Sequence, residues 1–163
     1  RLVGGSLPTE AQWNHAATGR GQRRVYPWGN SQAGCCNAST GRTSALLLVN
    51  ACASAGTEPV GSHPISAACN GLGDVSRDGV LDMGGSVTER TLDVPHDLED
   101  PCLGVEGVRH DPVCAAAADG VSVRVGRGGN WSNSFGAELS GLRVSGSRRG
   151  VGEGFRCVYS AGP

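Results

Sequence analysis

The sequence contains no lysine, a single methionine and few aromatic residues, which make up 4% of its 163 positions. All 14 basic residues are arginines, and 15 residues are acidic, so the formal net charge is −1. Such a chain has no global positive field that would draw it to nucleic acid or to anionic lipid, and we expect neither partner. No apolar run approaches the roughly 18 residues of a membrane span, so we expect no such span.

Glycine is abundant, with 27 residues, whereas large apolar side chains are sparse. Glycine favours turns and weakens helices and strands, so the composition predicts a loop-rich protein with little regular secondary structure. The length fits one domain. Long loops are expected over residues 34–73 and 93–120, which are rich in small residues, cysteine and proline.

Seven cysteines stand at positions 35, 36, 52, 69, 102, 114 and 157. They lack the paired CxxC spacing of a structural zinc site. The pattern therefore indicates disulfides and an extracytoplasmic protein that is secreted, periplasmic or at the cell surface. Pairing within the first four cysteines, and between Cys102 and Cys114, is plausible from their closeness in sequence. The connectivity stays open, and the odd number leaves at least one cysteine without a partner in the chain.

One helix is expected at the start, with Thr9 as its N-cap, Gln12 completing a capping box and an end near Gly19. Trp13 and two following alanines share one face of this helix. Apolar runs predict three strands, over Val121–Val125, Leu142–Val144 and Gly154–Tyr159, which we expect to form a small antiparallel sheet. Tyr26 and Trp28 are expected in the core.

Short motifs occur in a fixed order along the chain: LPTEAQW at 7–13, YPWGN at 26–30, LDMGGSV at 81–87, and GGNW at 128–131 followed by GFRC at 154–157. This series resembles the formylglycine-generating enzyme (sulfatase-modifying factor) family. The resemblance implies an α+β fold, loop-rich and C-type-lectin-like, with residues 1–163 forming a domain whose N-terminal part is missing. It also implies that the usual partner of Cys157 is absent.

The resemblance further bears on catalysis. Oxidase members of the family bind copper through two cysteines shortly after the GGS motif, because soft thiolates select Cu(I). Those positions fall on Asn133 and Glu138, so no copper is expected. The resemblance thus implies a non-catalytic ligand- or protein-binding module. The alternative is an oxidoreductase-type sulfatase-modifying domain whose remaining catalytic residues lie outside this chain.

A calcium site is a second hypothesis. Oxygen-bearing side chains stand at Asp74, Ser76, Asp78 and Asp82, and a glycine at position 79 permits a sharp turn between them, as in the first part of an EF-hand loop. The bidentate glutamate that usually closes such a loop is absent. The family's own calcium loop corresponds to Ser86 and Glu89. The alternative is a solvated acidic turn.

The stretch after the GGNW motif mixes aromatic, polar and arginine side chains, as binding loops on rigid scaffolds commonly do. We expect ligand contacts at Asn133, Phe135, Glu138 and Arg143, with an unidentified protein or glycan as partner. A related use of the fold, in receptor-like proteins produced by diversity-generating elements, has the same general character. A plain polar loop is the alternative. The four histidines (His15, His63, His96 and His110) are scattered and are expected at the surface.

Overall fold

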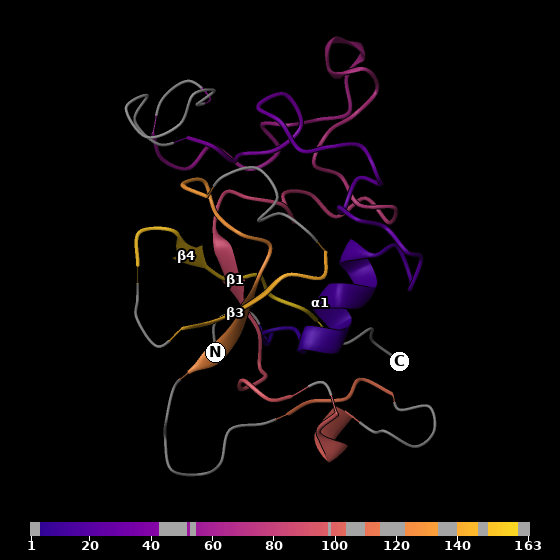
Figure 1. The fold of residues 1–163 in the computed structure, drawn as a ribbon, viewed down its shortest axis with the longest axis vertical. Helices are drawn as coiled ribbons and strands as arrows, with labels where there is room; N and C mark the ends of the chain where they lie inside the picture. The colour runs from indigo at the N-terminus through magenta and orange to yellow at the C-terminus, as the bar shows by residue number, and fades with distance from the viewer. Residues whose placement is uncertain are drawn as a thin grey trace.

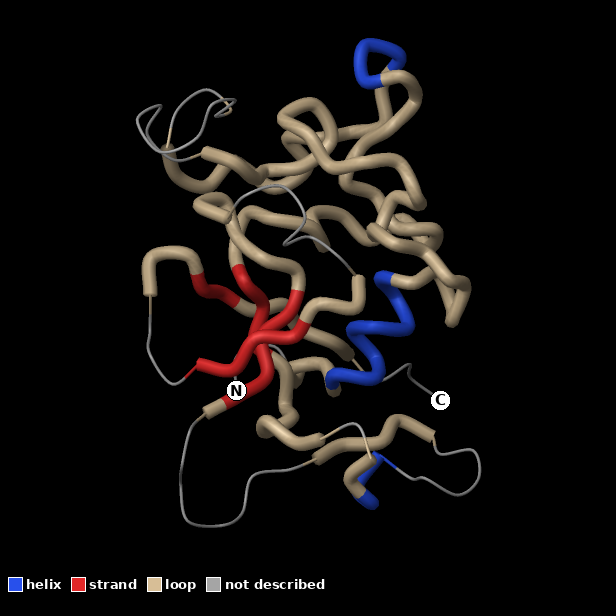
Figure 2. Tube along the Cα trace, viewed as in Figure 1, coloured by secondary structure: helices blue, strands red, loops and turns tan. Residues whose placement is uncertain are grey.

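The computed structural model describes residues 4–42, 52, 55–97, 99–103, 110–114, 123–133, 140–146 and 150–159. One helix, two short 3-10 helices and four short strands are present in these ranges (Figures 1 and 2). Their bounds are α1 Glu10–Ala17, η1 Ala67–Cys69, β1 Thr88–Arg90, η2 Pro101–Leu103, β2 Arg124–Arg127, β3 Arg143–Gly146 and β4 Glu153–Gly154. The expected α+β, loop-rich architecture is confirmed.

Helix α1 begins as the sequence predicts. The Thr9 hydroxyl accepts a hydrogen bond from Gln12 N at 3.1 Å, and the Gln12 side chain accepts one from Thr9 N at 3.0 Å. This capping box satisfies amide groups that have no partner inside the helix. Trp13 and Ala17 are buried on one face, and Ala16 packs beside them. The helix therefore contributes a narrow apolar stripe to the core.

The four strands form one sheet in the order β3-β2-β1-β4. Strand β2 pairs antiparallel with β1 and with β3, whereas β4 runs parallel to β1. The sheet is thus mixed, and the expectation of a purely antiparallel sheet was wrong. Strand β1 was not predicted, because its three polar residues have no apolar alternation. Strand β2 lies three residues beyond the start of the predicted run, of which residues 121 and 122 are outside the described ranges.

A small apolar cluster of Trp13, Ala17 and Met83 lies between α1 and the sheet. The Trp13 indole donates a hydrogen bond to Glu89 at 2.6 Å, and the Arg127 guanidinium lies over its ring, 5.1 Å from the centroid. Gly128 has φ +89°, and a Cβ there would lie 2.6 Å from the Met83 carbonyl oxygen. A glycine is therefore required where the chain passes this cluster.

The two aromatic rings of the YPWGN motif stack on each other. The rings of Tyr26 and Trp28 lie 5.0 Å apart and nearly parallel. Tyr26 is buried and Trp28 is half-buried, so the core assignment holds for Tyr26 only.

Disulfides fix much of the remaining chain. Cys35 pairs with Cys52, Cys36 with Cys69, and Cys102 with Cys114. Cys157 is free and exposed, which confirms the prediction that it lacks a partner. In the part of residues 35–73 that the structure describes, η1 is the one regular element, and Figure 2 shows this region as loops above the sheet. Residues 44–49, the one stretch of this region whose sequence suggests a strand or a helix, lie outside the described ranges. No helix in the described chain is long and apolar enough to cross a membrane.

Candidate ligand-binding site

The acidic turn at residues 74–82 does not gather its oxygens around one point. Asp74 is buried, and its Oδ2 accepts a hydrogen bond from Gly84 N at 2.9 Å. Ser76 is also buried, and its hydroxyl accepts from Val80 N. Asp78 faces outward and forms an ion pair with Arg20 at 2.9 Å. These side chains therefore bond to the turn itself and to neighbouring residues.

Two features of this turn are nevertheless suited to a cation. Asp74 Oδ1 is buried and has no hydrogen-bond partner. Burial is the main cause that raises the pKa of Asp74 to about 8, and the nearby Asp82 carboxylate adds to the shift. Asp82 has a left-handed backbone, with φ +54°, and its side chain accepts a hydrogen bond from Gly61 N at 2.7 Å. Asp74 and Asp82 are therefore the closest approach to a calcium site in this turn.

The two residues at the family's calcium position, Ser86 and Glu89, interact with other residues of the chain. Both carboxylate oxygens of Glu89 accept hydrogen bonds from Arg156, each at 2.5 Å, and one also accepts from Trp13. Ser86 has φ +57°, and its backbone bonds to Ser39. Arg156 therefore supplies the positive charge beside Glu89 in this structure, and calcium binding at Ser86 and Glu89 stays a prediction.

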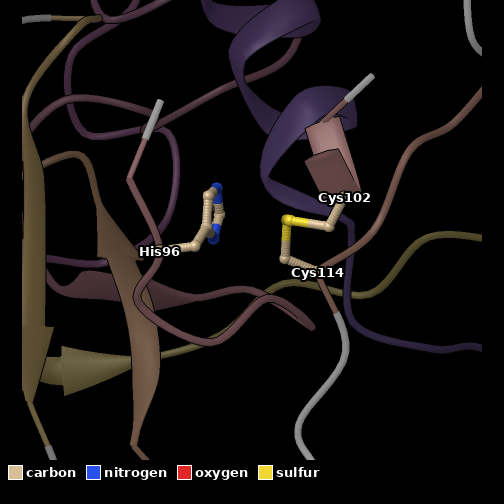
Figure 3. Close-up of side chains that lie close together, drawn as sticks. All are labelled: His96, Cys102 and Cys114. Atoms are coloured by element: carbon tan, nitrogen blue, oxygen red, sulfur yellow. A yellow bond between two sulfur atoms is a disulfide. The ribbon is translucent and has the colours of Figure 1, made fainter. Parts of the chain in front are cut away.

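One group of three possible metal ligands has its ligand atoms within 4.8 Å of one another, among the residues that the structure describes: His96, Cys102 and Cys114. Figure 3 shows the two cysteines joined by a disulfide, with the His96 ring facing them. Metal binding by cysteine needs the thiolate. The disulfide therefore leaves His96 as the one available ligand of the three, and the group does not form a metal site.

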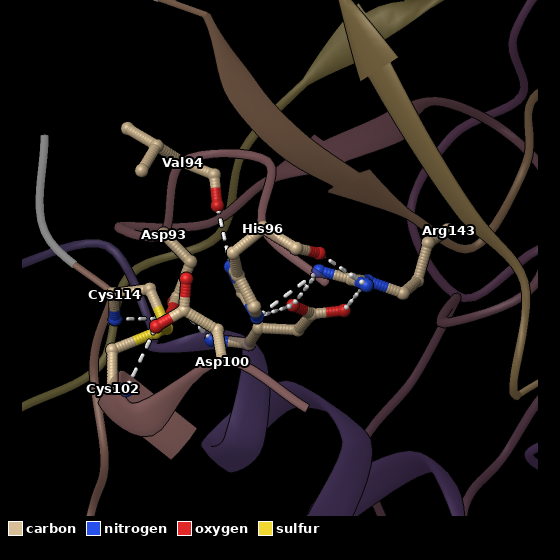
Figure 4. Close-up of a disulfide and its surroundings, with 8 residues drawn as sticks. Asp93, Val94, His96, Asp100, Cys102, Cys114 and Arg143 are labelled. Carbon is tan, nitrogen blue, oxygen red and sulfur yellow. Dashed lines mark hydrogen bonds and ion pairs between the residues drawn. A yellow bond between two sulfur atoms is a disulfide. The ribbon is translucent and has the colours of Figure 1, made fainter. Parts of the chain in front are cut away.

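His96 instead belongs to a partly buried polar network around Arg143 (Figure 4). Arg143 pairs with Glu10 at 2.6 Å and donates to the His96 carbonyl oxygen at 3.1 Å. Its Nη2 also lies 3.1 Å from His96 Nε2, while His96 Nδ1 lies 2.6 Å from the Val94 carbonyl oxygen. Since arginine only donates, Nε2 accepts and Nδ1 carries the proton.

The same network extends beneath the helix. Arg127 donates to Asn14 at 2.8 Å and to the Leu142 carbonyl oxygen at 2.7 Å, and it lies 3.6 Å from Glu10. Burial lowers the pKa of Arg127, and the Glu10 carboxylate opposes that shift. Asp93 accepts hydrogen bonds from Glu10 N and Cys114 N, which ties the disulfide to the start of α1. The His96 residue is half-buried and its side chain is only 3% exposed, so the expectation that it lies at the surface was wrong.

A pocket of about 200 Å³ opens beside this network. Strand β3, at the edge of the sheet, supplies Arg143, Val144 and Ser145, and Pro95, His96 and Val125 complete the lining. Pro95 and Val125 are the apolar residues that line the pocket with the guanidinium and the imidazole. Pockets of this kind, with a few polar groups among apolar ones, suit small ligand groups.

Two further pockets flank α1. One, of about 330 Å³, is lined by residues of the helix and by the segment 110–112. The other, of about 430 Å³, lies between the start of α1 and the segment 158–159. Neither contains a residue that the sequence singled out for binding.

The predicted ligand-binding residues do not all fall at one place. Arg143 lines the β3 pocket, whereas Asn133 does not. Asn133 is half-buried and its side chain accepts a hydrogen bond from Asn130 N at 2.7 Å. Its carbonyl oxygen accepts from Gly41 N, which holds the GGNW turn against the loop region. Phe135 and Glu138 lie outside the described residues.

Sequence reasoning missed His96 and Glu10 as neighbours of Arg143. They stand 47 and 133 positions from it in the chain. No local motif encodes a contact between residues so far apart, and only the fold brings them together.

Comparison with solved structures supports the fold. Variable protein 1 of Treponema denticola is similar with a TM-score of 0.63 and 26% identity, over 93% of this chain and 46% of that one. PvdO of Pseudomonas aeruginosa is similar in fold, with a TM-score of 0.61 and 23% identity, over 93% of this chain and 51% of that one. The chain therefore spans about half the length of these proteins.

No curated protein matches the chain in sequence. The family described as the sulfatase-modifying factor enzyme 1-like domain matches residues 1–161, which is nearly the whole sequence. The ordered motifs, the mixed sheet beside one capped helix and the similar structures all agree with this match. The chain belongs to the sulfatase-modifying factor enzyme 1-like family.

Proposed function

We propose that this domain is a non-catalytic, extracytoplasmic binding module. The observation that carries the proposal is the state of its cysteines: six are paired in three disulfides, and Cys157 alone is free. The copper centre implied by the family resemblance needs two thiolates, and this chain offers one free thiol. Three disulfides also favour an oxidising compartment.

The sequence around the expected copper position supports the same conclusion. Asn133 and Glu138 stand where the resemblance puts the two thiolates, and no cysteine occurs between Cys114 and Cys157. Asparagine and glutamate do not replace soft ligands of Cu(I).

Mass spectrometry of a cysteine-containing sulfatase peptide, incubated with the protein, Cu(I) and oxygen, tests this directly. We expect no conversion to formylglycine above a control without protein. Conversion by this chain would refute the proposal. Conversion only by a longer parent chain would support the alternative, an oxidoreductase whose remaining residues lie outside these 163 positions, which the half-length match to similar structures makes worth testing.

We place the ligand contacts at the β3 pocket. The Arg143 guanidinium and the His96 imidazole there are fixed by Glu10 and Val94, so their orientation costs a ligand little conformational entropy. Pro95 and Val125 add an apolar lining to the same pocket. A pocket that combines fixed polar groups with an aliphatic wall fits a polar group on a protein or glycan partner.

Paired substitutions distinguish this location from the loop after GGNW. Ser145→Trp fills the β3 pocket from an exposed position, and Ser132→Trp adds the same bulk to the exposed loop. On protein and glycan arrays, we expect Ser145→Trp to abolish the signals of the unsubstituted protein, and Ser132→Trp to retain them. The reverse result would move the site to the loop that contains Asn133.

We further propose calcium as a ligand of the turn that contains Asp74 and Asp82. The support is the buried Asp74 Oδ1, which has no hydrogen-bond partner. A ligand that binds only the folded state stabilises it by RT ln(1 + [L]/Kd), about 2.7 kcal/mol at 100 times Kd. Millimolar calcium should therefore raise the melting temperature, and Asp82→Asn should remove the rise. Asp78→Asn is the matched control, because Asp78 pairs with Arg20 instead. An unchanged melting curve with calcium would exclude the site.

A further inference from the structure

Three arginines converge where α1 ends. Arg77 donates from Nη1 to the Gly19 carbonyl oxygen at 3.3 Å, and a Cβ built at Gly19 would lie 3.1 Å from both Arg24 Nε and Arg77 Cβ. Arg20 reaches the same turn through its ion pair with Asp78, the residue after Arg77. We call Arg20, Arg24 and Arg77 the arginine patch. It lies at the end of α1 that points toward the loop region and away from η2 (Figure 1).

The charge of this patch is not balanced locally. Asp78 is the acidic residue paired within it, and its pKa is lowered first by the hydrogen bond from Arg20 and then by the charges of Arg20, Arg77 and His15. Arg20 and Arg77 thus act on one carboxylate, and Arg24 lies beside Gly19 in the same turn. The other eleven arginines and fourteen acidic residues lie elsewhere in the chain, so the remainder carries an excess of negative charge.

The arginine side chains are held in place but keep donors for a ligand. Arg24 donates to Gln22 at 3.2 Å and to the Pro27 carbonyl oxygen at 3.3 Å, and Arg77 donates to Gly19. A guanidinium carries five N–H groups. Contacts within the described residues use one or two of the five on each arginine, and Arg20 and Arg77 lie on exposed segments.

We propose that the arginine patch binds a sulfated sugar chain. Guanidinium forks match the paired oxygens of such anions. The three pockets described above are lined by other residues, so the proposed ligand contacts the patch through its charged groups and not through apolar side-chain anchors. The excess negative charge elsewhere opposes a long, densely charged polymer such as nucleic acid. A sugar chain with spaced sulfates on an uncharged body binds through charged groups and is not densely charged, so it suits both conditions.

Calorimetric titration of the 163-residue chain with a sulfated dextran oligosaccharide, and with neutral dextran, tests the proposal. We expect binding of the sulfated probe only, weakened by added salt because the contacts are ionic. Arg20→Gln and Arg77→Gln should each weaken binding about three- to tenfold. Arg24→Lys keeps the charge but loses the fork, so it should weaken binding less than Arg24→Gln.

Two neutralising variants separate the patch from overall charge. Asp78→Asn removes the carboxylate inside the patch and should tighten binding severalfold. Glu99→Gln makes the same change of charge beside η2, at the far end of α1, and should have little effect. Melting curves check that each variant is folded.

Several results would overturn the proposal: no binding of the sulfated probe, equal tightening by Asp78→Asn and Glu99→Gln, or tighter binding of an oligoglutamate peptide or a single-stranded oligonucleotide. Ser145→Trp should leave sulfated dextran binding unchanged, so failure of the β3 pocket and failure of the arginine patch can be told apart.

Discussion

The molecule contains two regions that are stabilised in different ways. Around α1 and the sheet, a few buried apolar side chains and a network of ion pairs hold the chain, with Trp13 at the centre. In the loop region of residues 35–73, two disulfides tie together segments with little regular structure. The difference shows that a short, glycine-rich chain can add loop area without enlarging its apolar core, provided that covalent links replace packing.

The largest effect should come from the centre of the first region. Trp13→Ala removes the main side chain of the apolar cluster and leaves Glu89 and Arg127 without their indole contact, so it should cost about 3–5 kcal/mol of unfolding free energy. Chemical denaturation measures this loss. Trp28→Ala is the control, because Trp28 is half-buried and should cost clearly less. Equal losses would mean that the YPWGN turn is as central as the helix.

The second region should respond to loss of a disulfide. Replacing Cys36 and Cys69 together by serine opens a link between residues 33 positions apart and should cost about 2–4 kcal/mol. Hydrogen exchange should then show loss of protection in the loop region while the amides of α1 stay protected. Cys157→Ser, which breaks no disulfide, should change neither. Simultaneous loss of protection in α1 would show that the two regions unfold as one unit.

A smaller effect tests the junction between the regions. Ser39 and Gly85 form an isolated bridge, and a Cβ at Gly85 would lie 2.3 Å from the Ser39 carbonyl oxygen. Gly79 has the same φ of +80° but no neighbour within 4 Å of such a Cβ. Gly85→Ala should therefore cost about 1–3 kcal/mol more than Gly79→Ala. Equal costs would indicate that backbone strain alone matters, and that the junction tolerates displacement.

The last effect is a pH dependence of stability that arises at Asp74. Burial raises its pKa to about 8 in the folded state, well above the range of an exposed aspartate. Between these values the folded protein binds the proton more strongly than the unfolded chain, so stability falls as pH rises. Asp74→Asn should flatten this slope in urea unfolding measured from pH 4 to pH 8. An unchanged slope would assign the dependence to other groups.

The sequence predicted the first region well because its signals are local. The capping box of Thr9 and Gln12 and the ordered motifs are read from neighbouring positions, and the free Cys157 followed from the odd cysteine count and the resemblance. Strand β1 was missed because Thr88, Glu89 and Arg90 show no strand pattern, and β4 was expected to be antiparallel because parallel pairing depends on the path of the whole chain.

The candidate site was less predictable because its contacts also join residues that lie far apart in the sequence. Arg143 was predicted to contact a ligand, and it lines a pocket in the structure, but its partners come from α1 and from the segment before η2. The acidic spacing at 74–82 suggested converging oxygens and the resemblance suggested a ligand at Glu89, whereas Asp78 pairs with Arg20 and Glu89 pairs with Arg156. In both cases an arginine competes with a cation for the carboxylate, and the spacing of the acidic residues does not reveal that arginine.

The exposed Cys157 has a practical consequence. With the other six sulfurs joined in disulfides, a maleimide dye should attach at this single position without any engineered cysteine. Cys157 adjoins Val158, which forms a backbone bridge with Ser6, so a fluorophore there would sit beside the contact between the first and last described segments of the chain. Its emission anisotropy would report when that contact opens during unfolding. It would thus show whether the contact opens before or after the Trp13 indole becomes exposed.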